Sequence, residues 1–271
     1  MRMTSFRTFA IALTFILTAA QSPDRITVHL AGDSTMAPKL AEKRPETGWG
    51  EMLPEFFDST KVRFVNHAKN GRSTRTFISE GLWQEIVDSL RVGDYVFIQF
   101  GHNDESKEKT DRYTPPSDYR ANLIRFISET KAKGAIPVLL TPVMRRRFDS
   151  KGAVRDTHGE YPDIVRSVAA EQHVALIDMH RKTERLLGLF GEQASSTLFL
   201  QLAPGENSNY PNGIQDNTHF SPFGARIVAS LAVEGIREAG LGLVAAFRKM
   251  PPPIAPTVSQ ALPISRTAAL Q

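Results

Sequence analysis

A serine follows directly on the first strongly apolar run of the chain after its N-terminal segment. Residues 26–31 are Ile-Thr-Val-His-Leu-Ala, and the run ends at Gly32-Asp33-Ser34. Strand-forming residues that stop at a glycine predict a buried strand that ends there. The serine then lies just past the strand end, where the rigid sheet fixes the position of its hydroxyl. Such a hydroxyl is well placed to act as a nucleophile. The same residues could also form an ordinary turn, because Gly, Asp and Ser are common turn residues.

A serine that cleaves an ester needs a base, an acid that orients the base, and hydrogen-bond donors for the oxyanion. His219 can supply the base, and Asp216, three residues earlier in an expected loop, can fold back to its other ring nitrogen. The donors can be the backbone N–H groups of Ser34 and Gly71 and the side-chain amide of Asn103. The Gly-x-Ser-x-Gly turn of α/β-hydrolases occurs nowhere in the chain, which argues against that alternative.

The elements that must position these residues are apolar runs alternating with longer amphipathic ones. Strands are expected at residues 26–31, 62–66, 95–100, 137–141 and 174–177. Helices are expected at residues 50–57, 76–90, 117–133, 161–172 and 221–240, and a long polar loop at about 188–215. Near-continuous apolar strands that alternate with helices predict an α/β fold, a three-layer α/β/α sandwich with a central five-stranded parallel sheet. Such sheets bind ligands at the carboxyl ends of their strands.

Four short blocks resemble those of the SGNH (GDSL) hydrolase superfamily: Gly32-Asp33-Ser34, Gly71, Gly101-His102-Asn103-Asp104 and Asp216-x-x-His219. Further segments are similar to the rhamnogalacturonan acetylesterase branch: Gly32-Asp33-Ser34-Thr35-Met36, Gly48-Trp49-Gly50, Asn70-Gly71-Arg72-Ser73-Thr74 and Thr141-Pro142-Val143. The resemblance implies a flavodoxin-like fold, no metal or other cofactor, and removal of acetyl groups from carbohydrate hydroxyls. It also implies a nucleophile, two oxyanion donors and an acid–base pair, which by position are Ser34, Gly71, Asn103, Asp216 and His219.

Basic and aromatic residues near the expected site are candidates for binding substrate. Arg145 and Arg146 follow the fourth strand, and Arg72 lies after the second. Arginine pairs bidentately with carboxylates, so these side chains could hold an acidic sugar, although a run of charges is also typical of a solvated face. Trp49, flanked by two glycines, could stack on a sugar ring or belong to the core. His102 is left outside the catalytic set and could shape the pocket.

Composition limits the remaining possibilities. The chain has 271 residues, 41% of them hydrophobic, which is enough for one domain with a substantial core. It has no cysteine, which excludes disulfides and thiolate chemistry. Seven histidines show no His-Glu-x-x-His spacing, so no catalytic metal is expected. A net charge of +4 is too weak to indicate a nucleic-acid partner, and a monomer is favoured.

The two ends of the chain differ from the middle. Residues 1–20 combine two arginines, an apolar run and small residues, which is typical of a secretory signal and too short to span a bilayer. Residues 21–248 are expected to form the hydrolase domain, and the Pro-rich residues 249–271 an extended, disordered tail. The protein is therefore predicted to be exported to the periplasm or the medium, without a stable membrane anchor.

Taken together, the sequence predicts an exported serine esterase that deacetylates a plant cell-wall polysaccharide, of which acetylated rhamnogalacturonan pectin is the favoured substrate. A lipase, thioesterase or acetylesterase for another sugar, built on the same fold, is the nearest alternative. A carbohydrate-binding protein without catalysis is a further one, against which the presence of Ser34, Asp216 and His219 argues.

Overall fold

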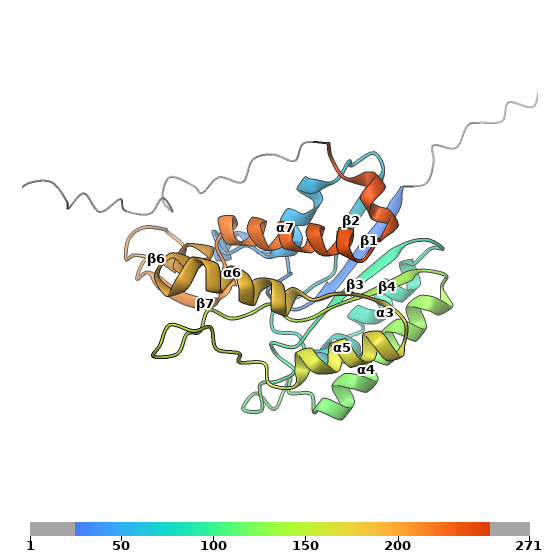
Figure 1. Ribbon diagram of the computed structural model, residues 1–271, viewed down its shortest axis with the longest axis horizontal. Coiled ribbons are helices and arrows are strands. Elements are labelled where there is room, and N and C mark those ends of the chain that lie inside the picture. The colour runs from blue at the N-terminus through green and yellow to red at the C-terminus, as the bar shows by residue number, and fades with distance from the viewer. Residues whose placement is uncertain (1–24, 250–271) are drawn as a thin grey trace, which may run out of the picture.

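Five parallel strands form the central sheet of the computed structural model, which describes residues 25–249 (Figure 1). They are β1 (Ile26–Gly32), β2 (Val62–Asn66), β3 (Tyr95–Gln99), β4 (Ile136–Leu140) and β5 (Ala175–Ile177). Their order is β2-β1-β3-β4-β5, and each neighbouring pair is parallel. The five predicted strands and the parallel sheet are thus confirmed. The predicted signal segment, and the tail from residue 250 onward, lie outside the described residues.

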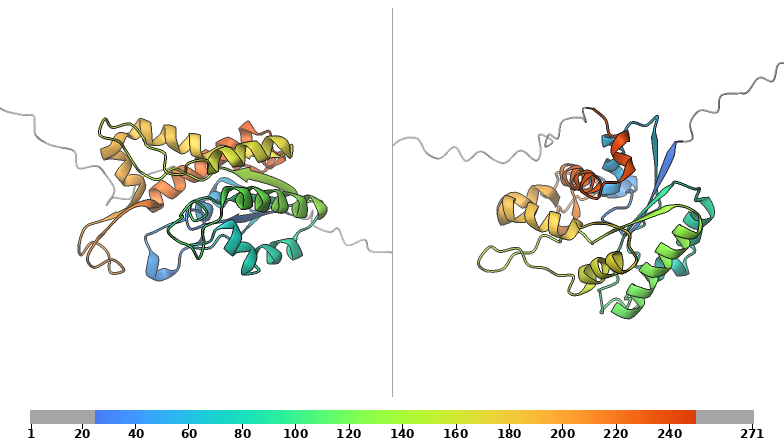
Figure 2. Two further views of the ribbon diagram at one scale, coloured as in Figure 1. Left: turned by 90° about the horizontal axis from the view of Figure 1, so that it is seen from below. Right: turned by 45° about the vertical axis from the view of Figure 1, so that its right-hand side comes forward.

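Helices cover both faces of this sheet (Figures 1 and 2). One face carries α1 (Trp49–Met52), α6 (Met179–Ala194) and α7 (Pro222–Glu238), which share a core with that side of the strands. The other carries α2 (Thr74–Ser79), α3 (Leu82–Ser89), α4 (Pro116–Ala132) and α5 (Tyr161–Glu171). Short 3-10 helices are η1 (Ala41–Lys43), η2 (Leu53–Phe56), η3 (Ser195–Leu198) and η4 (Gly242–Ala246). The three-layer sandwich is confirmed.

The strands are continuous apolar runs because both of their faces are buried. Successive side chains of a strand point to opposite faces. Leu30 therefore packs into the core beneath α7, whereas its neighbour Ala31 packs into the core beneath α4. The same alternation separates Phe97 from Ile98 on β3. The inner strands β1 and β3 therefore have no solvated face that would require polar residues at every second position, whereas the edge strand β2 is only partly buried.

Two predicted helices are interrupted in the structure. The helix expected at residues 76–90 is divided into α2 and α3 by Gly81, which has a φ of +77° and so ends the first helix. The helix expected at residues 50–57 is divided into α1 and η2. The helix expected to stop at Gly134 does so, since α4 ends at Ala132 and Gly134 has a φ of +70°.

The loop expected at about residues 188–215 is largely structured, so that prediction is wrong. Its first part belongs to α6, and a separate antiparallel hairpin follows, made of β6 (Phe199–Leu202) and β7 (Ile214–Phe220). The hairpin lies at one end of the molecule, beside α6 (Figures 1 and 2). Within residues 25–249, none of the helices combines the length and apolar character needed to cross a bilayer.

Candidate active site

Ser34 stands in a tight turn immediately after β1. The Asp33 carboxylate accepts hydrogen bonds from the backbone N–H of Thr35 at 3.0 Å and from its hydroxyl at 2.8 Å. The Asp33 carbonyl also accepts from the N–H groups of Met36 and Ala37. A side chain on Gly32 would lie 2.8 Å from the carbonyl oxygen of Gln99, so only glycine fits where the chain leaves the sheet. The turn therefore holds Ser34 firmly at the carboxyl end of β1, the second strand of the sheet.

Asp216 and His219 lie on a bulged strand rather than in the loop expected from the sequence. Phe199 pairs with Phe220 and Gln201 with Gln215, so one residue of β6 faces four residues of β7. The extra residues fold around the Asp216 carboxylate, which accepts the backbone N–H of Thr218 at 2.7 Å and that of His219 at 2.9 Å. Bulges of this kind re-aim side chains, and here the bulge turns both functional groups to the same side.

Ser34, His219 and Asp216 form one hydrogen-bonded line. The Ser34 hydroxyl oxygen is 2.9 Å from His219 Nε2, and His219 Nδ1 is 2.7 Å from the second carboxylate oxygen of Asp216. Burial by itself would raise the pKa of Asp216, but the bonds from His219 and Thr218 outweigh it and lower that pKa. The ionised carboxylate accepts the Nδ1–H bond, which leaves the Nε2 lone pair facing Ser34. This geometry lets His219 take a proton from the serine.

Two of the three predicted oxyanion donors, Gly71 and Asn103, lie on loops tied to the nucleophile turn and to each other. The N–H of Lys69 donates to the carbonyl of Gly32 at 3.1 Å, which anchors the loop after β2 beside the turn. Gly71 on this loop has a φ of +75°, a conformation that favours glycine. The Asn103 amide donates to the carbonyl of Arg72 at 3.0 Å, and it has a second hydrogen to give.

A buried ion pair beside the triad was missed by the sequence analysis. Lys39 Nζ lies 2.7 Å from Glu46 Oε1 and 2.8 Å from the Asn70 side-chain oxygen. It also donates to the Ser34 carbonyl at 2.5 Å. Glu46 Oε1 is in turn 4.0 Å from His219 Nε2. A lysine and a glutamate seven residues apart between two predicted elements look like surface charges, so the sequence carried no signal for this contact.

A second buried charge lies behind the nucleophile turn. His102 Nδ1 is 3.4 Å from the Asp33 carboxylate, and both side chains are almost fully buried. Burial would raise the pKa of Asp33, yet His102 and the bonds from Thr35 hold it at about 2. Burial also lowers the pKa of His102, against the pull of Asp33. None of these bonds joins His102 to Ser34, His219 or Asp216, and its place outside the triad stays a prediction.

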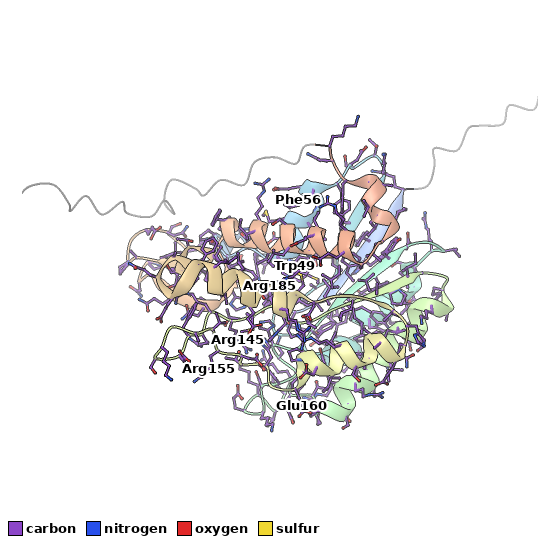
Figure 3. The ribbon with its side chains drawn as sticks, in the orientation of Figure 1. Trp49, Phe56, Arg145, Arg155, Glu160 and Arg185 are labelled. Carbon is purple, nitrogen blue, oxygen red and sulfur yellow. The ribbon has the colours of Figure 1, made fainter. Side chains whose placement is uncertain are left out.

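The arginines predicted to bind substrate are held by protein groups. Arg145, on the loop after β4 (Figure 3), forms an ion pair with Glu105 and donates to the carbonyl of His102 at 3.1 Å. Arg146 donates to the side chain of Asn217 at 2.9 Å, and its N–H bonds the Asn217 carbonyl at 2.8 Å. Arg146 thus connects the loop after β4 to the bulge that contains Asp216 and His219. A role of either side chain in substrate binding stays a prediction.

Trp49 cannot stack on a sugar, and that prediction is wrong. Its side chain is fully buried, and its indole N–H donates to Gln99 Oε1 at 2.7 Å. The flanking glycines are required by packing, because a side chain on Gly48 would lie 2.1 Å from the Ala37 carbonyl oxygen. Arg72 is partly exposed and pairs with Glu80 at 2.8 Å, so it remains a candidate at the rim.

A doubly wound parallel sheet with a Ser–His–Asp line at its carboxyl edge is the arrangement of a serine hydrolase. The model of the GDSL-like Lipase/Acylhydrolase family matches residues 30–227, which include Ser34, Asp216 and His219, and the chain belongs to this family. The protein is accordingly a carboxylic ester hydrolase.

Several characterised or solved proteins are similar to this chain. The rhamnogalacturonan acetylesterase RhgT of Bacillus subtilis is 45% identical over 80% of this chain and 92% of its own length. A rhamnogalacturonan acetylesterase of Emericella nidulans is 29% identical over 80% of this chain and 87% of its own. The structure of the Bacillus subtilis protein YxiM is 26% identical with a TM-score of 0.69, over 80% of this chain and 58% of that one.

Proposed function

We propose that this protein is a carbohydrate acetylesterase that removes acetyl groups from rhamnogalacturonan pectin through a Ser34–His219–Asp216 triad. The unbroken line of hydrogen bonds from Ser34 through His219 to Asp216 carries the catalytic part of this proposal. The similarity to two rhamnogalacturonan acetylesterases over four fifths of the chain supports the substrate class.

The first half of the reaction would acylate Ser34. His219 Nε2 takes the hydroxyl proton while Ser34 Oγ attacks the acetyl carbonyl carbon. The bond between that carbon and the sugar oxygen then breaks, and the sugar oxygen leaves with the proton from Nε2. Asp216 holds the imidazole in the required tautomer and stabilises the imidazolium that forms.

The second half would release acetate. A water molecule gives its proton to His219 Nε2 and attacks the acetyl-serine, and the Ser34 oxygen leaves with that proton. In both halves the negative oxygen would be stabilised by the N–H groups of Ser34 and Gly71 and the amide of Asn103. Donors that are already in position need no reorganisation when the charge develops. Each can therefore stabilise the transition state by on the order of 3 kcal/mol.

An acetate-release comparison tests the substrate and the acyl group. The protein is incubated with acetylated rhamnogalacturonan, acetylated xylan, and acetyl and octanoyl aryl esters. The proposal expects fastest release from rhamnogalacturonan and a strong preference for the acetyl ester. Faster turnover of the octanoyl ester would favour a lipase or thioesterase, and faster release from xylan would favour another sugar. Tight binding of the polysaccharide without acetate would favour a binding protein.

We further propose that the protein is exported. Residues 1–20 have the basic start, the apolar run and the small residues of a secretory signal. Expression of the full chain in a bacterium, followed by fractionation and N-terminal sequencing, tests this proposal. A shortened N-terminus near residue 21 in the periplasm or medium would support it, whereas an intact chain confined to the cytoplasm would contradict it.

A further inference from the structure

Three potential metal ligands lie close together where the loop after β4 meets the start of α6. Asp156 and His158 lie on the loop between β4 and α5, and His180 lies in the first turn of α6. Asp156 Oδ1 is 3.0 Å from His180 Nε2 and 3.5 Å from His158 Nδ1. One ligand atom from each of the three side chains lies within 4.8 Å of the others.

These separations suit a shared metal ion. Zinc binds imidazole nitrogen and carboxylate oxygen at about 2.0–2.1 Å, which places two ligands of a tetrahedral site about 3.3 Å apart. The two distances from Asp156 lie on either side of that value. A set of two imidazoles and one carboxylate suits zinc and similar divalent transition metals, and it leaves one position for water.

The hydrogen bonds among Asp156, His158 and His180 do not satisfy both ring nitrogens of His158. Its side chain is fully buried, its Nδ1 lies 3.5 Å from Asp156 Oδ1, and its Nε2 has no hydrogen-bond partner within residues 25–249. Buried polar atoms almost always have a partner, so a buried imidazole that faces a carboxylate at this distance, with its other nitrogen unpaired, is suited to share a metal ion with that carboxylate. Asp156 is 39% exposed, which provides a route for an ion from solvent.

We propose that Asp156, His158 and His180 bind one divalent ion, with Zn²⁺ as the best match. The ion would tie the loop after β4 to the start of α6. The His158 ring also packs edge-on against His102, with ring centroids 4.5 Å apart, and His102 faces Asp33 of the nucleophile turn. The ion therefore has a structural role behind the active site and touches no reacting atom. Arg145 is a cation near these three residues, and its charge is balanced by the ion pair that it forms with Glu105.

Metal binding can be measured without any esterase assay. The purified protein is stripped with a chelator, equilibrated with Zn²⁺ or Co²⁺ at micromolar concentration, desalted and analysed for metal. We expect about one ion per chain, a visible absorption band for bound Co²⁺, and a higher melting temperature with Zn²⁺ than with the chelator, because binding stabilises the folded state.

Variants decide whether these three residues are the ligands. Asp156→Asn changes an exposed ligand, and His180→Gln replaces a buried one by a polar side chain, so both variants should fold, yet each should lose the bound ion and the Co²⁺ band. His173→Asn, which removes an exposed histidine at a φ of +51°, is the matched control and should keep both. Absence of stoichiometric metal in the parent protein, or equal metal in all three variants, would overturn the proposal.

Discussion

Lys39 and Glu46 form an ion pair 2.7 Å long that is buried beside the hydrogen bond between Ser34 and His219. The lysine side chain is fully buried and the glutamate side chain is 9% exposed. Lys39 joins the carbonyl of the nucleophile to Asn70, the neighbour of Gly71. Glu46 places a second carboxylate 4.0 Å from the nitrogen of His219 that would carry the proton. The pair thus links the nucleophile, the oxyanion loop and the base.

Replacing Lys39 by methionine should destabilise the protein. The Glu46 carboxylate would then be buried without its partner, a change that costs about 3–5 kcal/mol in buried ion pairs. Urea denaturation gives the free energy of unfolding. The double variant Lys39→Met with Glu46→Gln removes both charges and should recover much of the loss. A single variant as stable as the parent would show that the pair has no energetic role.

Glu46→Gln should lower kcat by about tenfold and leave KM almost unchanged. The glutamate lies 4.0 Å from His219 throughout, but its charge attracts the ring only when the imidazolium forms in the transition state. About 1.4 kcal/mol of lost transition-state stabilisation is a factor of ten in rate. Steady-state kinetics on an acetyl aryl ester, with concentrations corrected for the folded fraction, provide the measurement. A rise in KM at constant kcat would instead assign Glu46 to substrate binding.

Asp216→Asn should reduce kcat by about 10³–10⁴-fold, as expected when an amide no longer fixes the histidine tautomer. Circular dichroism should show an unchanged fold, and Asp88→Asn on the exposed face of α3 is the matched control. A loss of less than tenfold would remove Asp216 from the proposed triad.

Arg145→Ala should make stability more dependent on pH. Burial raises the pKa of Glu105 to about 7, even though Arg145 lowers it. A carboxyl whose pKa is raised by folding stabilises the folded state below its unfolded pKa of 4.5, and that contribution is lost as pH rises toward 7. Without Arg145 the folded pKa rises further, so the variant should lose more stability at pH 8 than at pH 5.

Denaturation at these two pH values measures the effect of Arg145→Ala, and Arg145→Ala with Glu105→Gln should abolish the extra loss. Acetate release from acidic pectin and from neutral acetylated xylan separates the two roles of the arginine. Equal losses on both substrates indicate support of Glu105, whereas a larger loss on pectin indicates contact with uronate. Equal stability of variant and parent at pH 8 would contradict the structural role.

The strands and the position of Ser34 at a strand end could be predicted because their signals are local. A strand buried on both faces is a continuous apolar run, and Ser34 follows the first of these runs within three residues. Asp216 and His219 could be paired with Ser34 only through residue type and spacing. The bulge that aims them depends on pairing with β6, about 15 residues earlier in the chain, which no local pattern reveals.

The remaining differences between the expected and the observed structure arise from contacts between segments that are distant in the sequence or from packing. The glycines that flank Trp49 favoured a role in the site over one in the core, but they let the start of α1 approach the backbone at Ala37. Residues 188–215 look like a loop because they are polar and contain Pro204, Gly205, Pro211 and Gly213, and a φ of +70° at Gly191 does interrupt α6. Lys39 and Glu46 looked like surface charges because their partners are provided by the tertiary fold alone.

The identity of the nucleophile is tested most directly by covalent labelling. A fluorophosphonate reacts with an activated serine and loses fluoride, which leaves a phosphonyl group that peptide mass spectrometry can locate. The account predicts labelling of Ser34 in the parent protein, no labelling in His219→Ala, and no acetate release from a folded Ser34→Ala variant. Label on another residue, or full activity of Ser34→Ala, would contradict it.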